Sequence, residues 1–167
     1  MHLLPKSGKS AAVLLGCVVL CLVVGGVGSL LTTPNLEPWY AGLTKPSFNP
    51  PNWVFAPVWT TLFLFMAYAV WRIWQVPQEP IEIGDQRRRA IWAFGVHLVL
   101  NVAWSAAFFF AQSPALGLAV ILIFGLSVAT VMILFFKLDR LAGLLFVPYL
   151  LWVLFATLLN LSIFLLN

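Results

Sequence analysis

Polar and aromatic side chains share one face of a helix expected around Asn101. At 100° per residue, several positions of similar character fall within about 60° of Asn101. They are His97, Trp104, Ser105, Phe108 and Gln112. Aromatic rings beside an amide favour recognition of a flat apolar molecule, because the rings stack against it and the amide fixes its orientation.

Two other segments carry aromatic stripes of the same kind. Trp59 and Phe63 share one helical face, and Tyr149, Trp152 and Ala156 lie together on another. If these stripes and that of Asn101 all face inward, they enclose one chamber. Each tryptophan alone is equally compatible with ordinary core packing. The residues by themselves leave both interpretations open.

The same residues show no arrangement for catalysis. The sequence has no nucleophile paired with a base, no carboxylate pair and no nucleotide-binding loop. His97 is a candidate axial ligand of a haem, but no second axial ligand is evident, and a histidine within a membrane more often bonds a neighbouring helix. We expect no metal site and no required cofactor.

The composition places these residues in a membrane. Of 167 residues, 62% are hydrophobic and 8% are charged, and the mean hydropathy is +1.01. About a quarter of an average soluble domain is charged, so a soluble fold could not cover its surface with so few charges. Nucleic-acid binding is excluded as well, because the basic residues form no aromatic-interleaved groove.

Five apolar runs are each long enough to cross a bilayer core of about 30 Å. They cover residues 10–31, 54–76, 91–111, 116–136 and 142–166, and none contains an acidic residue. Short loops predict an all-α, five-helix, up-and-down bundle that forms one domain over residues 1–167. The first run also resembles a signal peptide, but it continues to Leu31, which favours a spanning helix.

Basic residues predict the orientation of this bundle. Eight of the nine lie at one end, counting Arg87–Arg89 in the loop 77–90: Lys6, Lys9, Arg72, Arg87, Arg88, Arg89, Lys137 and Arg140. Lys45 alone lies at the other end. The positive-inside rule then predicts a cytoplasmic N-terminus, with the C-terminus and the first loop outside. We expect a bacterial inner membrane.

The first loop, residues 32–53, is rich in proline and aromatic residues. They include Pro46 and Pro51, and Trp39, Tyr40 and Phe48. Because proline fixes φ and restricts the residue before it, we predict a stiff, non-helical strap. The strap is either an aromatic belt at the membrane interface or a lid over a pocket; stiffness favours the lid, since it loses less entropy on closing.

The order of these motifs resembles the TspO/MBR family, the tryptophan-rich sensory and translocator proteins. The first loop matches it at Trp39-Tyr40, Leu43, Lys45-Pro46 and Pro50-Pro51, and the second run at Trp53-Val54-Phe55, Pro57 and Val58-Trp59-Thr60. Later matches are Asn101, Trp104, Leu138-Asp139, Ala142-Gly143, Leu145, Val147-Pro148-Tyr149-Leu150-Leu151-Trp152, Ala156-Thr157 and Asn160.

The resemblance implies a pocket beneath the first loop for a porphyrin, such as protoporphyrin IX or haem, and for benzodiazepine-type ligands. Positions matching Trp59, Asn101, Trp152 and Ala156 belong to that pocket in the family. Two departures stand out. Ser47 and Phe48 replace two tryptophans that many bacterial members carry, and no basic residue follows Tyr149 to complete the proposed sterol pattern.

Three functions follow as expectations from this resemblance and from the residues. The first is a sensor or regulator that binds tetrapyrroles; any light-dependent degradation of a porphyrin would act through Trp59 and Trp152. The second is a passive carrier, since no acidic residue lies in a span to couple protons. The third is a structural role in which Ala103, Ala107 and Ala111 pack against another helix or a second protomer in a homodimer.

Overall fold

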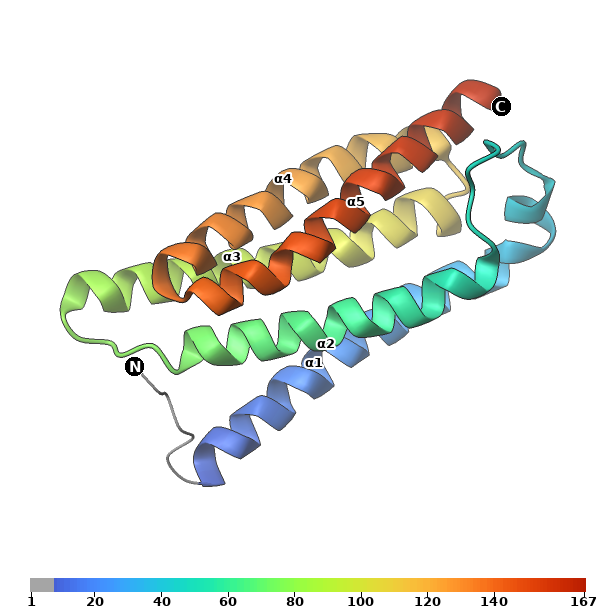
Figure 1. Cartoon of the computed structure of the whole chain (residues 1–167). Coiled ribbons are helices and arrows are strands. Elements are labelled where there is room, and N and C mark those ends of the chain that lie inside the picture. Colours follow the sequence, from blue (N-terminus) through green and yellow to red (C-terminus); the bar gives the residue numbers. More distant parts are fainter. Residues whose placement is uncertain (1–7) are drawn as a thin grey trace.

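A computed structural model describes residues 8–167 as a bundle of long helices (Figure 1). Within them, five helices are long and apolar enough to span a membrane, and no strand occurs. They are α1 (Gly8–Thr32), α2 (Phe55–Trp74), α3 (Ile81–Ser105), α4 (Pro114–Leu138) and α5 (Arg140–Leu166). The predicted all-α fold with five spanning helices is therefore confirmed. Lys6 lies outside the described residues.

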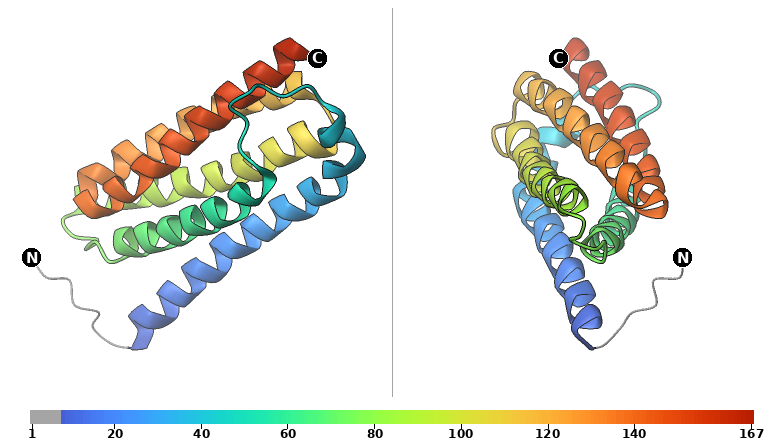
Figure 2. Two further views of the ribbon diagram at one scale, coloured as in Figure 1. Left: turned by 45° about the vertical axis from the view of Figure 1, so that its right-hand side comes forward. Right: turned by 90° about the vertical axis from the view of Figure 1, so that its left-hand side faces the viewer.

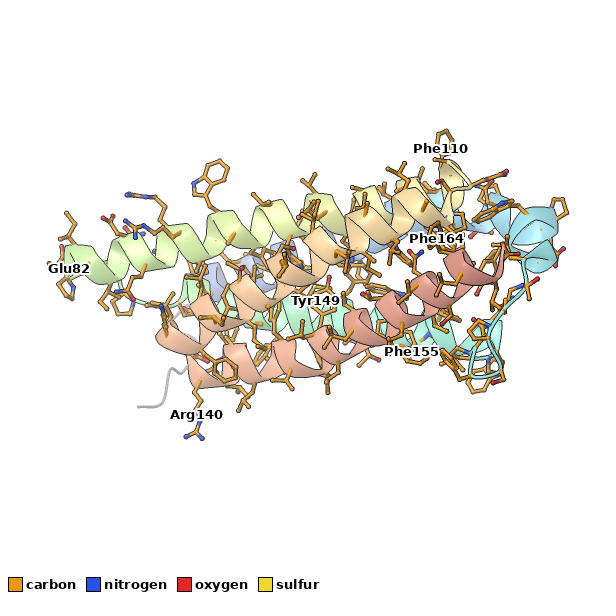
Figure 3. All side chains as sticks on the ribbon, turned by 90° about the horizontal axis from the view of Figure 1, so that it is seen from above. Glu82, Phe110, Arg140, Tyr149, Phe155 and Phe164 are labelled. Atoms are coloured by element: carbon orange, nitrogen blue, oxygen red, sulfur yellow. The ribbon has the colours of Figure 1, made fainter. Side chains whose placement is uncertain are left out.

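The helices form a closed ring in the order α1–α2–α5–α4–α3, in which each helix packs against the next (Figure 2). The connections lie at alternate ends of the bundle, which makes neighbours in sequence antiparallel. Glu82 and Arg140, near the starts of α3 and α5, lie at one end, and Phe110 and Phe164 lie at the other (Figure 3). The loop between α1 and α2 belongs to this second end (Figure 1).

Two predicted boundaries were wrong. Helix α3 begins at Ile81 rather than at residue 91, so Arg87–Arg89 lie on a helix and not in a loop. The first loop is not entirely non-helical, because short helical turns at Thr33–Asn35 and Leu36–Tyr40 prolong α1. A proline in the first turn of such a segment costs little, since its missing N–H would have no helical partner there.

Buried aromatic side chains fill the space between α3, α4 and α5. Figure 3 shows Tyr149 in the middle of this packing, and the rings of Phe146 and Tyr149 lie 5.7 Å apart, edge to face. Gly143 and Gly117 allow close approach there, because a Cβ on Gly117 would lie 2.7 Å from the Phe108 ring. Leucine, isoleucine and valine side chains are exposed around the outside, as lipid solvation of this surface requires.

One ion pair joins the helices at the end where α5 begins. Arg72 of α2 donates two hydrogen bonds, of 2.9 and 2.6 Å, to the carboxylate of Asp139. The same carboxylate accepts from the backbone N–H of Ala142 at 2.7 Å and so caps α5. Burial alone would raise the pKa of Asp139, but the bonds from Arg72 and from the backbone outweigh it, and the pKa lies below its ordinary value.

Candidate ligand cavity

A cavity of about 440 Å³ lies between α1, α2 and α3, at the end of the bundle that carries the α1–α2 loop. Its aromatic walls are Tyr40, Phe55, Trp59, Phe63, Trp104 and Phe109. Hydroxyl and amide groups also reach it, from Ser29, Thr32, Thr33, Asn52, Thr60, Asn101 and Ser105. A mostly apolar space with a few polar groups is typical of small-molecule sites.

Half of the α1 residues that line this cavity are glycines. Gly25, Gly26 and Gly28 all line it, so the α1 backbone approaches the space directly. A Cβ on Gly25 would lie 2.6 Å from the ring of Phe63, which leaves no room for a side chain. Our sequence reasoning missed α1 as a wall. The signal was the run from Gly25 to Ser29, because small residues let other groups come close to a helix.

Asn101 supplies the convergent amide that the sequence analysis predicted. Its side chain is buried, and its Nδ2 donates a hydrogen bond of 3.2 Å to the hydroxyl of Tyr149. The amide oxygen has no hydrogen-bond partner within residues 8–167. Since Asn101 lines the cavity, this oxygen is available to accept a hydrogen bond from a ligand.

Trp104 is held in place by a chain of hydrogen bonds across three helices. Its indole N–H donates to Oδ1 of Asn160 at 3.2 Å, and Nδ2 of Asn160 donates to the carbonyl of Pro114 at 2.7 Å. The Trp104 ring also stacks on Phe108, with 5.8 Å between ring centres. These contacts fix the indole orientation before any ligand arrives, which lowers the cost of binding.

The loop between α1 and α2 closes the end of the cavity. Tyr40 lines the space and donates from its hydroxyl to Oδ1 of Asn49 at 3.2 Å, while the Lys45 ammonium lies 4.6 Å from its ring centre. The side chain of Asn167 bonds both the N–H and the carbonyl of Thr44, at 2.9 and 3.0 Å. The loop is therefore tied to the end of α5 rather than left free.

Other predicted loop residues lie outside the cavity. Trp39 packs edge-on against Phe108, with 5.5 Å between ring centres. Phe48 is exposed and lies 6.4 Å from the ring of Phe155. Pro46 is half-buried and Pro51 is exposed, and neither lines the cavity.

The structure does not bring all three aromatic stripes into one chamber. Trp59, Phe63, Asn101 and Trp104 meet at the cavity, whereas Trp152 lines a separate open groove between α2 and α5. The prediction placed α5 beside the chamber, but α2 separates α5 from α1 in the ring, and the third wall comes from α1. Trp152 packs edge-on against Phe55 of the cavity wall, with 5.8 Å between ring centres.

Three predicted ligand residues are buried behind the cavity: Phe108, in the helical segment Ala106–Phe110 that follows α3, and Tyr149 and Ala156 of α5. Tyr149 accepts the hydrogen bond from Asn101 and packs edge-on against Trp59, with 6.2 Å between ring centres. Phe108 and Ala156 are buried in the packing and do not line the space. They support the walls rather than forming them.

His97 is also enclosed in the core. Its Nδ1 lies 2.7 Å from the carbonyl of Phe94 on its own helix, and its buried Nε2 has no hydrogen-bond partner among the described residues. Within residues 8–167, His97 therefore makes no bond to a neighbouring helix. Aromatic rings surround it, with Phe124 stacked at 6.4 Å and Tyr149 edge-on at 5.7 Å. His97 does not line the cavity, and a haem there would have no path to its imidazole.

The three alanines predicted as a dimer face differ in exposure. Ala107 is buried within the chain, Ala103 is half-buried and Ala111 is exposed. The homodimer stays a prediction.

In the part of the chain from residue 8 onwards, no group of three or more histidine, cysteine or acidic side chains could hold a metal ion.

Comparison with known proteins identifies the family. The sequence profile of the TspO/MBR family matches residues 17–166, which contain every residue that lines the cavity. The chain belongs to the TspO/MBR family. As a member with five helices able to span a membrane, it is an integral, multi-pass membrane protein.

Relatives from all three domains of life resemble this TspO/MBR chain along most of its length. The "Tryptophan-rich protein TspO" of Chlorobaculum tepidum is 40% identical over 151 residues, which cover 90% of this chain and 93% of the relative. The protein of the same name from Archaeoglobus fulgidus is 37% identical, with 92% and 96% covered. The human "Translocator protein" is 35% identical, with 93% and 86% covered.

Proposed function

We propose that this TspO/MBR protein is a membrane sensor that binds a porphyrin or a similar flat apolar molecule in the cavity between α1, α2 and α3. The observation that carries the proposal is the pairing of aromatic walls with the unpartnered oxygen of Asn101. A sensing role agrees with the name "Tryptophan-rich sensory protein" of a relative from Cereibacter sphaeroides, which is 36% identical.

The walls suit a macrocycle such as protoporphyrin IX or haem. The ring centres of Trp59 and Phe63 lie 5.8 Å apart with their planes inclined by 32°, so one helix offers two adjacent, tilted ring faces. Stacking on such faces contributes about 0.5–1.5 kcal/mol per pair beyond the burial of area. The Asn101 oxygen accepts a hydrogen bond from a ring N–H or a protonated carboxyl group of the ligand.

We further propose a bacterial inner membrane, with the loop and the C-terminus outside. Support comes from the charges at the two ends of the bundle. Lys45 lies in the α1–α2 loop, whereas the other described basic residues, Lys9, Arg72, Arg87, Arg88, Arg89, Lys137 and Arg140, lie toward the opposite end. The positive-inside rule then puts the opposite end in the cytoplasm. The cavity would open nearer the outer leaflet.

The test is a titration of the purified chain in detergent with protoporphyrin IX, followed by the change in porphyrin absorbance. Trp59→Leu is expected to weaken saturable binding about two- to tenfold, since it removes one stacking partner. Trp152→Leu is the matched control, because this indole lies in the groove between α2 and α5. If Trp152→Leu weakens porphyrin binding and Trp59→Leu does not, the ligand lies in that groove and the proposal is wrong.

Sensing and passive carriage make different predictions in sealed vesicles. A sensor binds the porphyrin but does not speed its passage across the bilayer, whereas a carrier does. Equal porphyrin uptake by vesicles with and without the protein, together with saturable binding, supports the sensor. Faster uptake that disappears in Trp59→Leu would make the protein a carrier.

A further inference from the structure

A second cavity, of about 450 Å³, lies at the opposite end of the bundle, where α2 ends and α3 begins. Its lining includes Trp74, Gln78, Ile81, Arg87, Arg88 and Trp92. None of these residues lines the candidate porphyrin cavity. The two sites therefore have separate chemistry, and we call this second one the Arg87 cavity.

Arg87 is a buried cation without a counter-charge. The residue is 8% exposed, and within residues 8–167 it forms no ion pair. Its Nε–H is buried and has no hydrogen-bond partner in the described chain. A buried charge that lacks a partner is costly, so an anion that enters the cavity would be bound favourably.

The contact between Arg87 and Trp74 does not provide a hydrogen-bond acceptor for the N–H groups of the guanidinium. The guanidinium carbon lies 5.8 Å from the centre of the Trp74 ring, within range of a cation–π interaction. A cation–π contact uses the face of the guanidinium, whereas its N–H groups lie in the plane. The in-plane donors remain free for a group with two acceptor oxygens, and phosphate has this geometry.

The other charges at this cavity leave it basic. Asp85 is paired with Arg88 by a bond of 2.8 Å between exposed side chains, which offsets its charge. Arg87 then carries the net positive charge that faces the space. The indole of Trp92 is 71% exposed, and tryptophans on the outside of a bundle favour the depth of lipid headgroups.

We propose that the Arg87 cavity binds the phosphate of an anionic phospholipid headgroup. The Nε–H and a terminal N–H of Arg87 donate to two phosphate oxygens, and the amide of Gln78 is close enough to the cavity to add a donor. The acyl chains would lie along the apolar outer surface of α3. A free phosphate ion has the same acceptors but lacks this apolar part.

The experiment measures lipid binding to the detergent-solubilised full chain by native mass spectrometry. The probes are a short-chain phosphatidylglycerol and the matching phosphatidylcholine, with inorganic phosphate as a third arm. Both lipids carry the phosphate, but the quaternary ammonium of phosphatidylcholine cancels its charge and is repelled by Arg87. We therefore expect the first phosphatidylglycerol to bind about tenfold more tightly than phosphatidylcholine. Arg87→Gln is expected to abolish this preference. Arg89→Gln, which removes the same charge from an exposed position outside the cavity, should keep it.

A second pair of variants tests the same cavity in case Arg87→Gln does not fold. Ile81 lines the cavity but is mostly exposed, so Ile81→Glu adds a repelling carboxylate without disturbing the core. Its control, Gln86→Glu, adds the same charge at an exposed position that does not line the cavity. The proposal is supported if Ile81→Glu loses the preference for phosphatidylglycerol while Gln86→Glu keeps it.

Two results would overturn it. If the controls lose the preference as fully as Arg87→Gln and Ile81→Glu, diffuse surface charge attracts the lipid and the cavity plays no part. If inorganic phosphate displaces the lipid at equal concentration, the site belongs to a soluble anion and the lipid assignment is wrong.

Discussion

Replacing Gly25 by alanine should close part of the candidate porphyrin cavity. A Cβ at this position would lie 2.6, 2.9 and 3.3 Å from three carbon atoms of the Phe63 ring. Carbon atoms pack at about 3.5–4.0 Å, so the ring must retreat by about 1 Å. Phe63 is buried against Trp59, 5.8 Å away between ring centres, and the cavity is the open space beside both rings.

The displaced ring then occupies space that the ligand needs. Forcing an extra methyl group into a packed site costs about 1–3 kcal/mol. If the ligand must reverse this displacement, its affinity falls by roughly 5- to 150-fold, at 1.4 kcal/mol for each factor of ten. The assay is the absorbance titration with protoporphyrin IX in detergent, with circular dichroism to verify that the helices are intact.

Gly26→Ala is the matched control for this prediction. Gly26 also lines the cavity, but a Cβ there would meet no atom within 4 Å. Both variants change glycine to alanine in adjacent positions of α1, so any effect on helix propensity is shared. Wild-type affinity in both variants would contradict this prediction, because ligand binding would then not depend on the position of Phe63.

Three further predictions concern contacts that hold the helices and the α1–α2 loop in place. Asp139→Ala should lower the free energy of unfolding by about 2–4 kcal/mol, since it removes a helix cap and charged hydrogen bonds. The pKa of Asp139 in the folded protein lies below the ordinary 3.8. Thermal unfolding of the wild type should therefore show this stabilisation at neutral pH and its loss as the pH falls below 3.8 through the folded pKa. Asn167→Ala should speed hydrogen exchange of the Thr44 amide in detergent, while unchanged exchange would mean that the loop is held elsewhere. Gly117→Ala should lower the thermal midpoint, because its Cβ would lie 2.7 Å from the Phe108 ring, and an unchanged midpoint would show that this ring can move away.

The spanning helices could be predicted because their signal is length and apolarity alone. The start of α3 could not, since Glu82, Asp85 and Arg87 lie on a helical extension beyond the apolar run. Hydropathy detects only the part of a helix that lies in the membrane. The helical turns after α1 were missed for another reason. The prolines of the first loop led us to expect a non-helical strap, but Pro34 stands where a short helix begins and is tolerated there.

Part of the candidate site could be predicted from the sequence. The rest depends on which helices lie next to one another, which the sequence pattern does not show. Helical periodicity shows that Trp104 and Asn101 share a face, and both line the cavity. Periodicity does not show which helix that face meets, so Trp152 was assigned to the same space although the ring order places it behind α2. The wall formed by Gly25 was missed, because a glycine has no side chain to mark a face.

The most direct test is a crystal structure of the full chain grown with protoporphyrin IX. We predict density for the macrocycle between α1, α2 and α3, in contact with Trp59 and Phe63 and within hydrogen-bond distance of the Asn101 oxygen. Density for the macrocycle in the groove beside Trp152, with the space under Tyr40 empty, would contradict it.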